Sequence, residues 1–162
     1  MGEYQNPLDP RNSTRPGLST VERPMDNPDA QTKIDALVVK FFSAFDNRGG
    51  ARPRLEQIVE CFTEKATIVR RSSSGAEVYT AAEFATPRIE LLNQGALRDF
   101  HEFETDSTTQ IFNGIAVRTS RYRKSGTMDG KPYHGSGTKC FQLVDLATAW
   151  KISSLAWVDD DA

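Results

Sequence analysis

The sequence predicts one α+β domain in which three helices pack on one face of a mostly antiparallel sheet. In the first half of the chain, apolar residues recur at the three- and four-residue spacing of amphipathic helices. From Leu97 onward the chain is typical of strands separated by turn dipeptides. Helices followed by a run of hairpin-linked strands indicate the α+β class. The 162 residues, 38% hydrophobic and 26% charged, fit one globular domain.

The first 28 residues differ in composition from the rest. Five of the eight prolines lie there, with few apolar side chains, so ordering this stretch would bury too little surface to offset its entropy cost. We expect residues 1–28 to form a flexible arm and residues 29–162 to form the folded domain. Packing of the arm on a partner subunit is the alternative.

Two helices are expected before the first strand. Apolar residues at helical spacing predict the first over 29–47, and Asn47-Arg48-Gly49-Gly50 ends it. Pro53 suits the first turn of a second helix. A short strand is expected over 66–71, followed by a turn rich in serine.

A third helix is expected to begin at Thr80, which forms a capping box with Glu83. Pro87 lies inside this helix and predicts a kink or a restart, with Thr86 able to cap the second part. Gly95 closes the helix.

Turn dipeptides delimit the sheet. Asn113-Gly114 and Asp129-Gly130 are strong two-residue hairpin turns, and Ala147-Thr148 is a plausible third connection. They predict four long antiparallel strands, over 98–112, 115–127, 132–146 and 149–158.

Simple hairpin register assigns one set of side chains to the face that the helices cover. Its apolar members are Phe103, Ile111, Ala116, Tyr122, Phe141, Leu143, Trp150 and Ile152. Its polar members are His101, Thr105, Arg118, Ser120 and Lys139. The polar side chains gather toward one end of the strands, so this face predicts a packed base and a polar-lined ligand cavity.

The opposite face is expected to carry an apolar patch and solvent-facing ion pairs. The pairs are Glu104 with Arg123 and Asp106 with Arg121, and the patch comprises Phe112, Ile115, Val117, Val144, Leu155 and Trp157. Exposed apolar patches of this kind mark interfaces. We therefore expect a homodimer formed through Val117, Val144, Leu155 and Trp157. A β-bulge anywhere in these strands would move part of this set to the other face of the sheet.

The chain resembles the nuclear-transport-factor-2-like superfamily, the cone-shaped, cystatin-like α+β fold of ketosteroid isomerase, scytalone dehydratase and polyketide cyclases. The resemblance covers 29–158 and depends on the segments 38–45, 61–68 and 150–157. It extends to an uncharacterised bacterial branch with the polar marks Pro87-Arg88, Glu102, Glu104, Arg118, Ser120 and Tyr122. It implies a curved sheet wrapped around the helices, and it leaves function open because this fold hosts both enzymes and binding domains.

The resemblance does not carry over the catalytic residues of ketosteroid isomerase. The tyrosine position of the first helix is Phe42, and the general-base position is Arg70, which cannot abstract a proton at neutral pH. Tyr122 and His101 are the candidates for acid or base in this chain. Any reaction would be that of a cofactor-independent lyase or isomerase.

The basic residues indicate a different role. Arg70, Arg118 and Lys139 could converge at the cavity mouth beside Ser120, and arginine binds carboxylates in a bidentate manner. We expect a small anionic or carboxylate-bearing ligand, with Glu102 and Glu104 near it. Alternatively, one of these two glutamates pairs with Arg118 internally and closes the cone, or the domain is a non-catalytic association module.

Several function classes are disfavoured. The net charge of −2 and the acidic neighbours of the basic runs disfavour nucleic acid as a partner. No apolar run approaches a membrane span, and the N-terminus lacks a signal-peptide core, so a cytoplasmic location is expected. Cys61 and Cys140 stand alone without metal-ligand spacing. We expect no metal and no cofactor.

Overall fold

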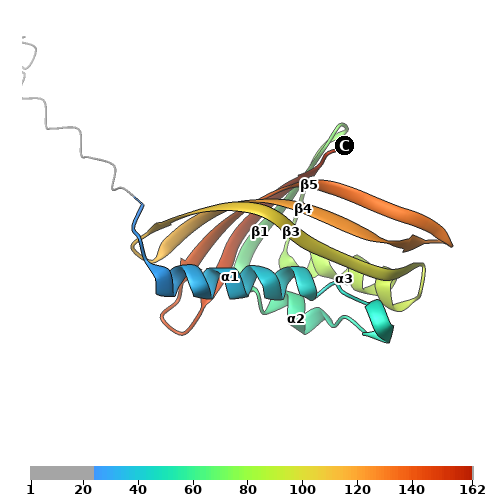
Figure 1. Cartoon of the computed structure of the whole chain (residues 1–162), viewed down its shortest axis with the longest axis horizontal. Coiled ribbons are helices and arrows are strands. Elements are labelled where there is room, and N and C mark those ends of the chain that lie inside the picture. The colour runs from blue at the N-terminus through green and yellow to red at the C-terminus, as the bar shows by residue number, and fades with distance from the viewer. Residues whose placement is uncertain (1–23, 162) are drawn as a thin grey trace, which may run out of the picture.

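The computed structural model describes residues 24–161, which form a curved six-stranded sheet with three α-helices and one short 3₁₀ helix; the α-helices lie on the concave side of the sheet (Figure 1). The strand order is β2-β1-β6-β5-β4-β3, and every neighbouring pair is antiparallel except β1 and β6. The helices are α1 (Pro28–Ser43), η1 (Arg48–Gly50), α2 (Leu55–Val59) and α3 (Ala81–Asn93). The strands are β1 (Phe62–Ser72), β2 (Gly75–Tyr79), β3 (Leu97–Phe112), β4 (Ile115–Met128), β5 (Lys131–Asp145) and β6 (Trp150–Asp159). The predicted α+β class is confirmed.

The proposed arm lies almost entirely outside the described residues. Its last residues, 24–28, are described, and there the Met25 amide donates a hydrogen bond to the Ile111 carbonyl at 2.7 Å. The freedom of residues 1–23 therefore stays a prediction.

The helices begin where their capping residues are. Asn27 accepts a hydrogen bond from the Ala30 amide and starts α1, which ends at Ser43 rather than at residue 47. Thr80 and Glu83 form the expected capping box of α3. The expected restart at Pro87 is wrong, because α3 continues through it as one helix.

The hairpin turns confirm the strand boundaries to within about two residues. Both residues of Asn113-Gly114 have positive φ (21° and 87°), as do both residues of Asp129-Gly130 (47° and 79°), which is the geometry of a type I′ turn. The strand β2 was not expected. It forms because Ser72 and Gly75 close a tight hairpin on β1.

Register shifts change which face several side chains occupy. The β3–β4 ladder slips between Arg98 and His101 and again between Glu104 and Asp106. Because each slip exchanges the two faces, Phe103 points outward and is 42% exposed, whereas Glu104 points inward. The expected inward Phe103 and the expected Glu104–Arg123 surface pair are therefore wrong.

A third shift changes β6 and the proposed dimer face. The β5–β6 register slips between Gln142 and Leu143, which turns Leu155 and Trp157 into the core, where they are 1% and 6% exposed. Neither Leu155 nor Trp157 can therefore contribute to an interface on the outer face of the sheet, and their place in the expected dimer interface is wrong. Val117 does face outward, and Val144 is half-buried.

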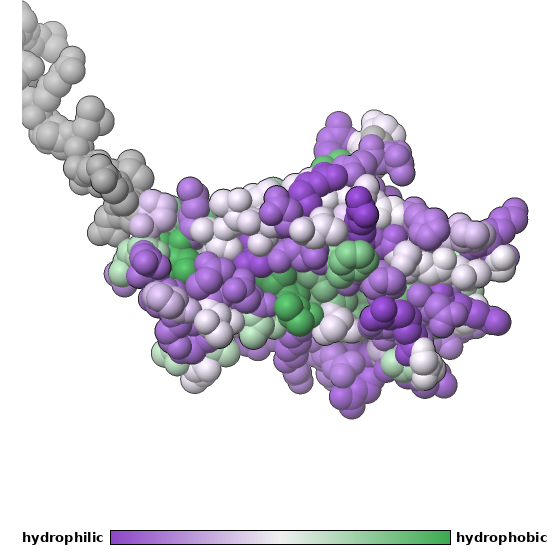
Figure 2. All heavy atoms as spheres, viewed as in Figure 1, coloured by the Kyte–Doolittle hydropathy of each residue, from purple (hydrophilic) through white to green (hydrophobic). Residues whose placement is uncertain are grey.

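The surface seen in Figure 2 is largely hydrophilic, with hydrophobic side chains exposed only in small groups. The core lies between the concave face of the sheet and helices α1 and α3. No helix within residues 24–161 is both long and apolar enough to cross a membrane.

Candidate ligand-binding cavity

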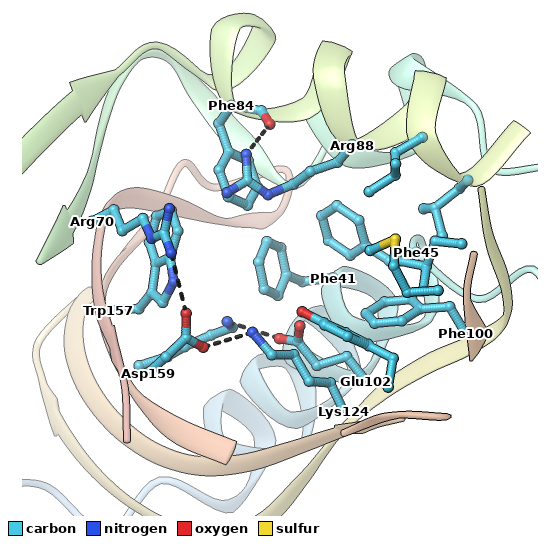
Figure 3. Close-up of a pocket in the computed structure, with 16 residues that line it drawn as sticks. Phe41, Phe45, Arg70, Phe84, Arg88, Phe100, Glu102, Lys124, Trp157 and Asp159 are labelled. Carbon is cyan, nitrogen blue, oxygen red and sulfur yellow. Dashed lines mark hydrogen bonds and ion pairs between the residues drawn. The ribbon is translucent and has the colours of Figure 1, made fainter. Parts of the chain in front are cut away.

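A cavity of about 250 Å³ opens between helices α1 and α3 and the concave face of the sheet (Figure 3). Its lining combines apolar and charged side chains. The apolar and aromatic members are Phe41, Phe45, Phe84, Leu91, Leu92, Leu97, Phe100, Met128, Tyr133 and Trp157. The charged members are Arg70, Arg88, Glu102, Lys124, Lys139 and Asp159.

Aromatic rings form the base of the cavity. Phe41, fully buried, makes an edge contact with Phe45 at 5.5 Å between ring centroids and stacks on Phe84 at 6.5 Å. Phe84 in turn meets the Trp157 ring edge to face at 5.4 Å. These rings pack against one another. They line the cavity and do not fill the space between the helices and the sheet.

Arg88, on α3, reaches over these rings. Its guanidinium carbon lies 4.1 Å from the centroid of Phe84 and 5.3 Å from that of Trp157, and it donates a hydrogen bond to the Phe84 carbonyl at 2.6 Å. Among residues 24–161, no carboxylate lies within salt-bridge distance of this group. Burial lowers the pKa of Arg88 below its ordinary value.

Two ion pairs cross the sheet side of the cavity. Lys139 Nζ lies 2.7 Å from Glu102 Oε1, and Lys124 Nζ lies 2.6 Å from Asp159 Oδ1. Arg70 approaches Asp159 more loosely, at 3.7 Å. Burial raises the pKa of Asp159, but hydrogen bonds and charges from its neighbours outweigh this effect and lower the pKa overall.

Tyr122 lies behind this row of charges. It is 1% exposed, and its hydroxyl donates a hydrogen bond to Asp159 Oδ1 at 2.5 Å. Burial and that carboxylate raise the pKa of Tyr122 well above its ordinary value. The side chain is therefore a neutral donor that fixes Asp159, and it is not itself part of the cavity lining.

Arg118 and Ser120 occupy a different part of the concave face. The Arg118 side chain is 5% exposed and binds Glu104 through Nε at 3.0 Å and through Nη2 at 2.5 Å. It also binds Asp35 at 2.6 Å, and the Ser120 hydroxyl donates to Glu104. Arg118 thus makes the internal pair that was the alternative to ligand binding, and neither it, Ser120 nor Glu104 lines the cavity.

His101 lies outside the cone. The bulge after Arg98 turns it outward, where its ring stacks on Phe103 at 5.2 Å and its Nδ1 lies 3.2 Å from Ser125 Oγ. Of the predicted site residues, the cavity brings together Arg70, Lys139 and Glu102.

Sequence reasoning missed Arg88, Lys124 and Asp159 as cavity residues. Asp159 is the last residue of β6, which carries it to the cavity. A stronger signal was the spacing of Phe84 and Arg88, four residues apart on one helix face. Within residues 24–161, no group of three or more His, Cys, Asp or Glu side chains is arranged to hold a metal ion.

Comparison with known proteins identifies the fold. No known family model and no curated protein matches the chain. Among solved structures, a protein of unknown function with a cystatin-like fold from Nostoc punctiforme superposes with a TM-score of 0.63 at 14% identity, covering 84% of this chain and 95% of that one. The hexachlorocyclohexane dehydrochlorinase LinA-type3 from Novosphingobium barchaimii gives 0.64 at 13% identity, covering 82% and 87%.

A third solved structure is a candidate calcium/calmodulin-dependent kinase II association domain from Exiguobacterium sibiricum. Its TM-score is 0.62 at 9% identity, covering 85% of this chain and 98% of that one. The chain therefore has the cystatin-like cone fold of nuclear-transport-factor-2-like proteins. These identities establish the fold and leave the activity to the site itself.

Proposed function

We propose that the protein binds a small organic anion, with a carboxylate or similar group at Arg88 and an apolar or aromatic body against the rings of the cavity. The observation that carries the proposal is the Arg88 guanidinium, which faces the cavity without a carboxylate partner among the described residues. A half-buried guanidinium without an anion is costly, and a ligand carboxylate would supply the missing partner.

The balance of charge supports the same ligand class. Four cationic and two anionic side chains line the cavity, so the two carboxylates cannot neutralise all the cations. The remaining lining is mainly aromatic and aliphatic, which suits a ligand with one charged end.

Catalysis is a separate question. Hexachlorocyclohexane dehydrochlorinases share the fold, and a lyase or isomerase reaction without a cofactor is the enzymatic form of our proposal. The acid or base roles of Tyr122 and His101 stay predictions. His101 lies outside the cone and does not line the cavity, which disfavours a role for it as acid or base in a reaction there.

Arg88→Gln is expected to weaken the binding of benzoate, phenylacetate or indole-3-acetate by about ten- to a hundredfold, the contribution of a charge-assisted hydrogen bond. Isothermal titration calorimetry measures this change directly. The primary amide of each ligand should bind weakly to both proteins, because it offers Arg88 no charge.

Arg98→Gln is the matched control. Arg98 also donates to a backbone carbonyl, that of Gly95 at 2.9 Å, but does not line the cavity. Equal losses in both variants would assign the effect to general charge and refute a specific role of Arg88. If the unmodified protein binds none of the three acids, this ligand class is wrong.

A second candidate function is association through the convex face of the sheet. One cross-strand row on this face carries only small uncharged side chains: Thr108, Thr119, Cys140, Ala156 and Val69. Such a row suits flat packing against a second copy, and one solved neighbour is described as an association domain. We propose this row with Val117 as the dimer face in place of Leu155 and Trp157.

Thr119→Arg is expected to convert a dimer into a monomer, because it places a cation within that row, next to Cys140 and Thr108. Light scattering coupled to size exclusion at micromolar concentration measures the change. Thr148→Arg, in the exposed β5–β6 loop, is the control and should leave the dimer intact. A monomeric unmodified protein at that concentration would contradict the dimer.

A further inference from the structure

We propose that Lys139 is an imine-forming nucleophile, so that the cavity captures the aldehyde or 2-oxo group of a small organic anion covalently, with Glu102 moving the proton. This inference rests on the proposed function, since the carbonyl compound has to enter the same cavity. It adds a substrate class, carbonyl-bearing carboxylates, and a reactive group.

The position of Lys139 is unusual for a lysine. Its side chain is 6% exposed, it lines the cavity, and its ammonium lies 3.8 Å from the centroid of the Tyr122 ring. Lysines are almost never buried without a reason that offsets the loss of solvation. Here the only carboxylate in salt-bridge contact, among the described residues, is that of Glu102.

A purely structural cation on the same face looks different. Arg118 directs its donors to Glu104, Asp35 and Thr109 and lies away from the cavity. The Lys139 ammonium has three donors and one carboxylate. Its remaining contacts are with aromatic rings and the cavity, where an incoming carbonyl group can reach it.

Burial favours the neutral amine at Lys139. Lys124 and Asp159, on β4 and β6, form their own ion pair beside it, and Arg70 and Arg88 line the cavity from β1 and α3. Burial lowers the pKa of Lys139, and Lys124 lowers it further, whereas Glu102 and Asp159 oppose this. The pKa lies below its ordinary value overall, so a larger fraction of Lys139 is nucleophilic at neutral pH.

The chemical step balances within this pair. Glu102 accepts a proton from the ammonium, and the amine lone pair attacks the carbonyl carbon to form a C–N bond. The carbonyl oxygen takes that proton from Glu102 and becomes a hydroxyl. A second proton passes from nitrogen through Glu102 to the hydroxyl, the C–O bond breaks, water leaves and the C=N bond forms. The nitrogen keeps its third proton, so the product is the iminium, and an ammonium and a carbonyl have become an iminium and one water.

The ligand geometry follows from the shared ring. Arg88 and Lys139 both lie close to Trp157, at 5.3 Å and 5.6 Å from the ring centroid. A flat molecule with a carboxylate at one end and a carbonyl at the other can therefore lie along Trp157 and meet both groups. The probe 4-carboxybenzaldehyde has this form.

We would incubate the protein with 4-carboxybenzaldehyde and sodium cyanoborohydride, which reduces an imine to a stable secondary amine. Intact-mass and peptide-mapping spectrometry should find one 4-carboxybenzyl group on Lys139, formed faster than on the exposed lysines, because burial lowers the pKa of Lys139 and leaves more of it as the neutral amine. Labelling of Lys139 no faster than Lys33 or Lys131 would overturn the inference.

Two variants separate reactivity from folding. Lys139→Arg keeps the charge beside Glu102 and should lose the adduct while retaining the native circular dichroism spectrum. Glu102→Gln should slow adduct formation and change its pH profile, because the proton carrier is removed while Lys139 remains. An unchanged rate and pH profile in Glu102→Gln would refute the assigned role of Glu102.

The non-reactive analogue 4-(hydroxymethyl)benzoate distinguishes the two proposals. If it binds in a manner that depends on Arg88 but the aldehyde gives no Lys139 adduct, the anion site stands and the imine inference is wrong. If the analogue does not bind and no adduct forms, both are wrong.

Discussion

Glu104→Ala is expected to lower the free energy of unfolding by about 3–5 kcal/mol, the cost of removing one partner of a buried ion pair, because the half-exposed Asp35 is then the one carboxylate left to Arg118 among the described residues. Glu104 holds Arg118 by two hydrogen bonds of 3.0 Å and 2.5 Å, and Arg118 is 5% exposed. Ser120 also loses its acceptor in this variant. Urea denaturation monitored by tryptophan fluorescence measures the change, since Trp150 and Trp157 are both buried.

Two comparisons test whether burial causes this loss. Asp35 also binds Arg118, but its side chain is 50% exposed, so Asp35→Ala should cost no more than about 1 kcal/mol. The double variant Glu104→Leu with Arg118→Met should recover most of the stability, because a buried pair and an apolar pair of similar volume are often equivalent. A Glu104→Ala cost as small as that of Asp35→Ala would contradict a buried pair.

The role of Arg118 determines how Glu104→Ala affects ligand binding. If Arg118 is structural, Glu104→Ala at a temperature where it remains folded should bind benzoate as tightly as the unmodified protein does. The alternative, in which Arg118 is a ligand residue, predicts a changed affinity because its guanidinium would be released. Calorimetry below the unfolding transition separates the two.

Most of the fold was predictable because local chemistry determines it. Asn113-Gly114 and Asp129-Gly130 have one low-energy way to reverse an extended chain, and they fix three of the six strands to within about two residues. The parallel pairing of β1 with β6 was not predictable in this way. It joins residues about 90 positions apart, and no local turn encodes it.

The cavity was harder to predict because it depends on which face each side chain occupies. A single bulge exchanges the two faces of everything beyond it, and β3 contains two such shifts. They bring Glu102 and Glu104 inside and turn His101 and Phe103 outside, the reverse of simple alternation. Lys139, whose ladder with β4 has no shift, was placed correctly on the concave face.

Gly137→Ala is expected to destabilise the protein by about 3 kcal/mol, at the upper end of the usual cost of overpacking. Gly137 lies directly opposite Tyr122 in the β4–β5 ladder, and an added Cβ would collide with the Tyr122 hydroxyl and with the Val158 carbonyl oxygen. A backbone oxygen in the middle of a sheet cannot move aside as a flexible side chain can. The tyrosine would have to leave Asp159, which would then lose its hydrogen bond.

Gly135→Ala is the matched control two residues away on the same strand. Its added Cβ would meet only the aliphatic atoms of the Lys124 side chain, which can adjust more easily than a backbone oxygen, so a smaller cost of about 1 kcal/mol is expected. Thermal and urea unfolding of both variants measures the difference. Because Asp159 anchors Lys124 on one wall of the cavity, the folded Gly137→Ala protein should also bind benzoate more weakly. Equal stability of the two variants would contradict the close approach of Tyr122 to β5.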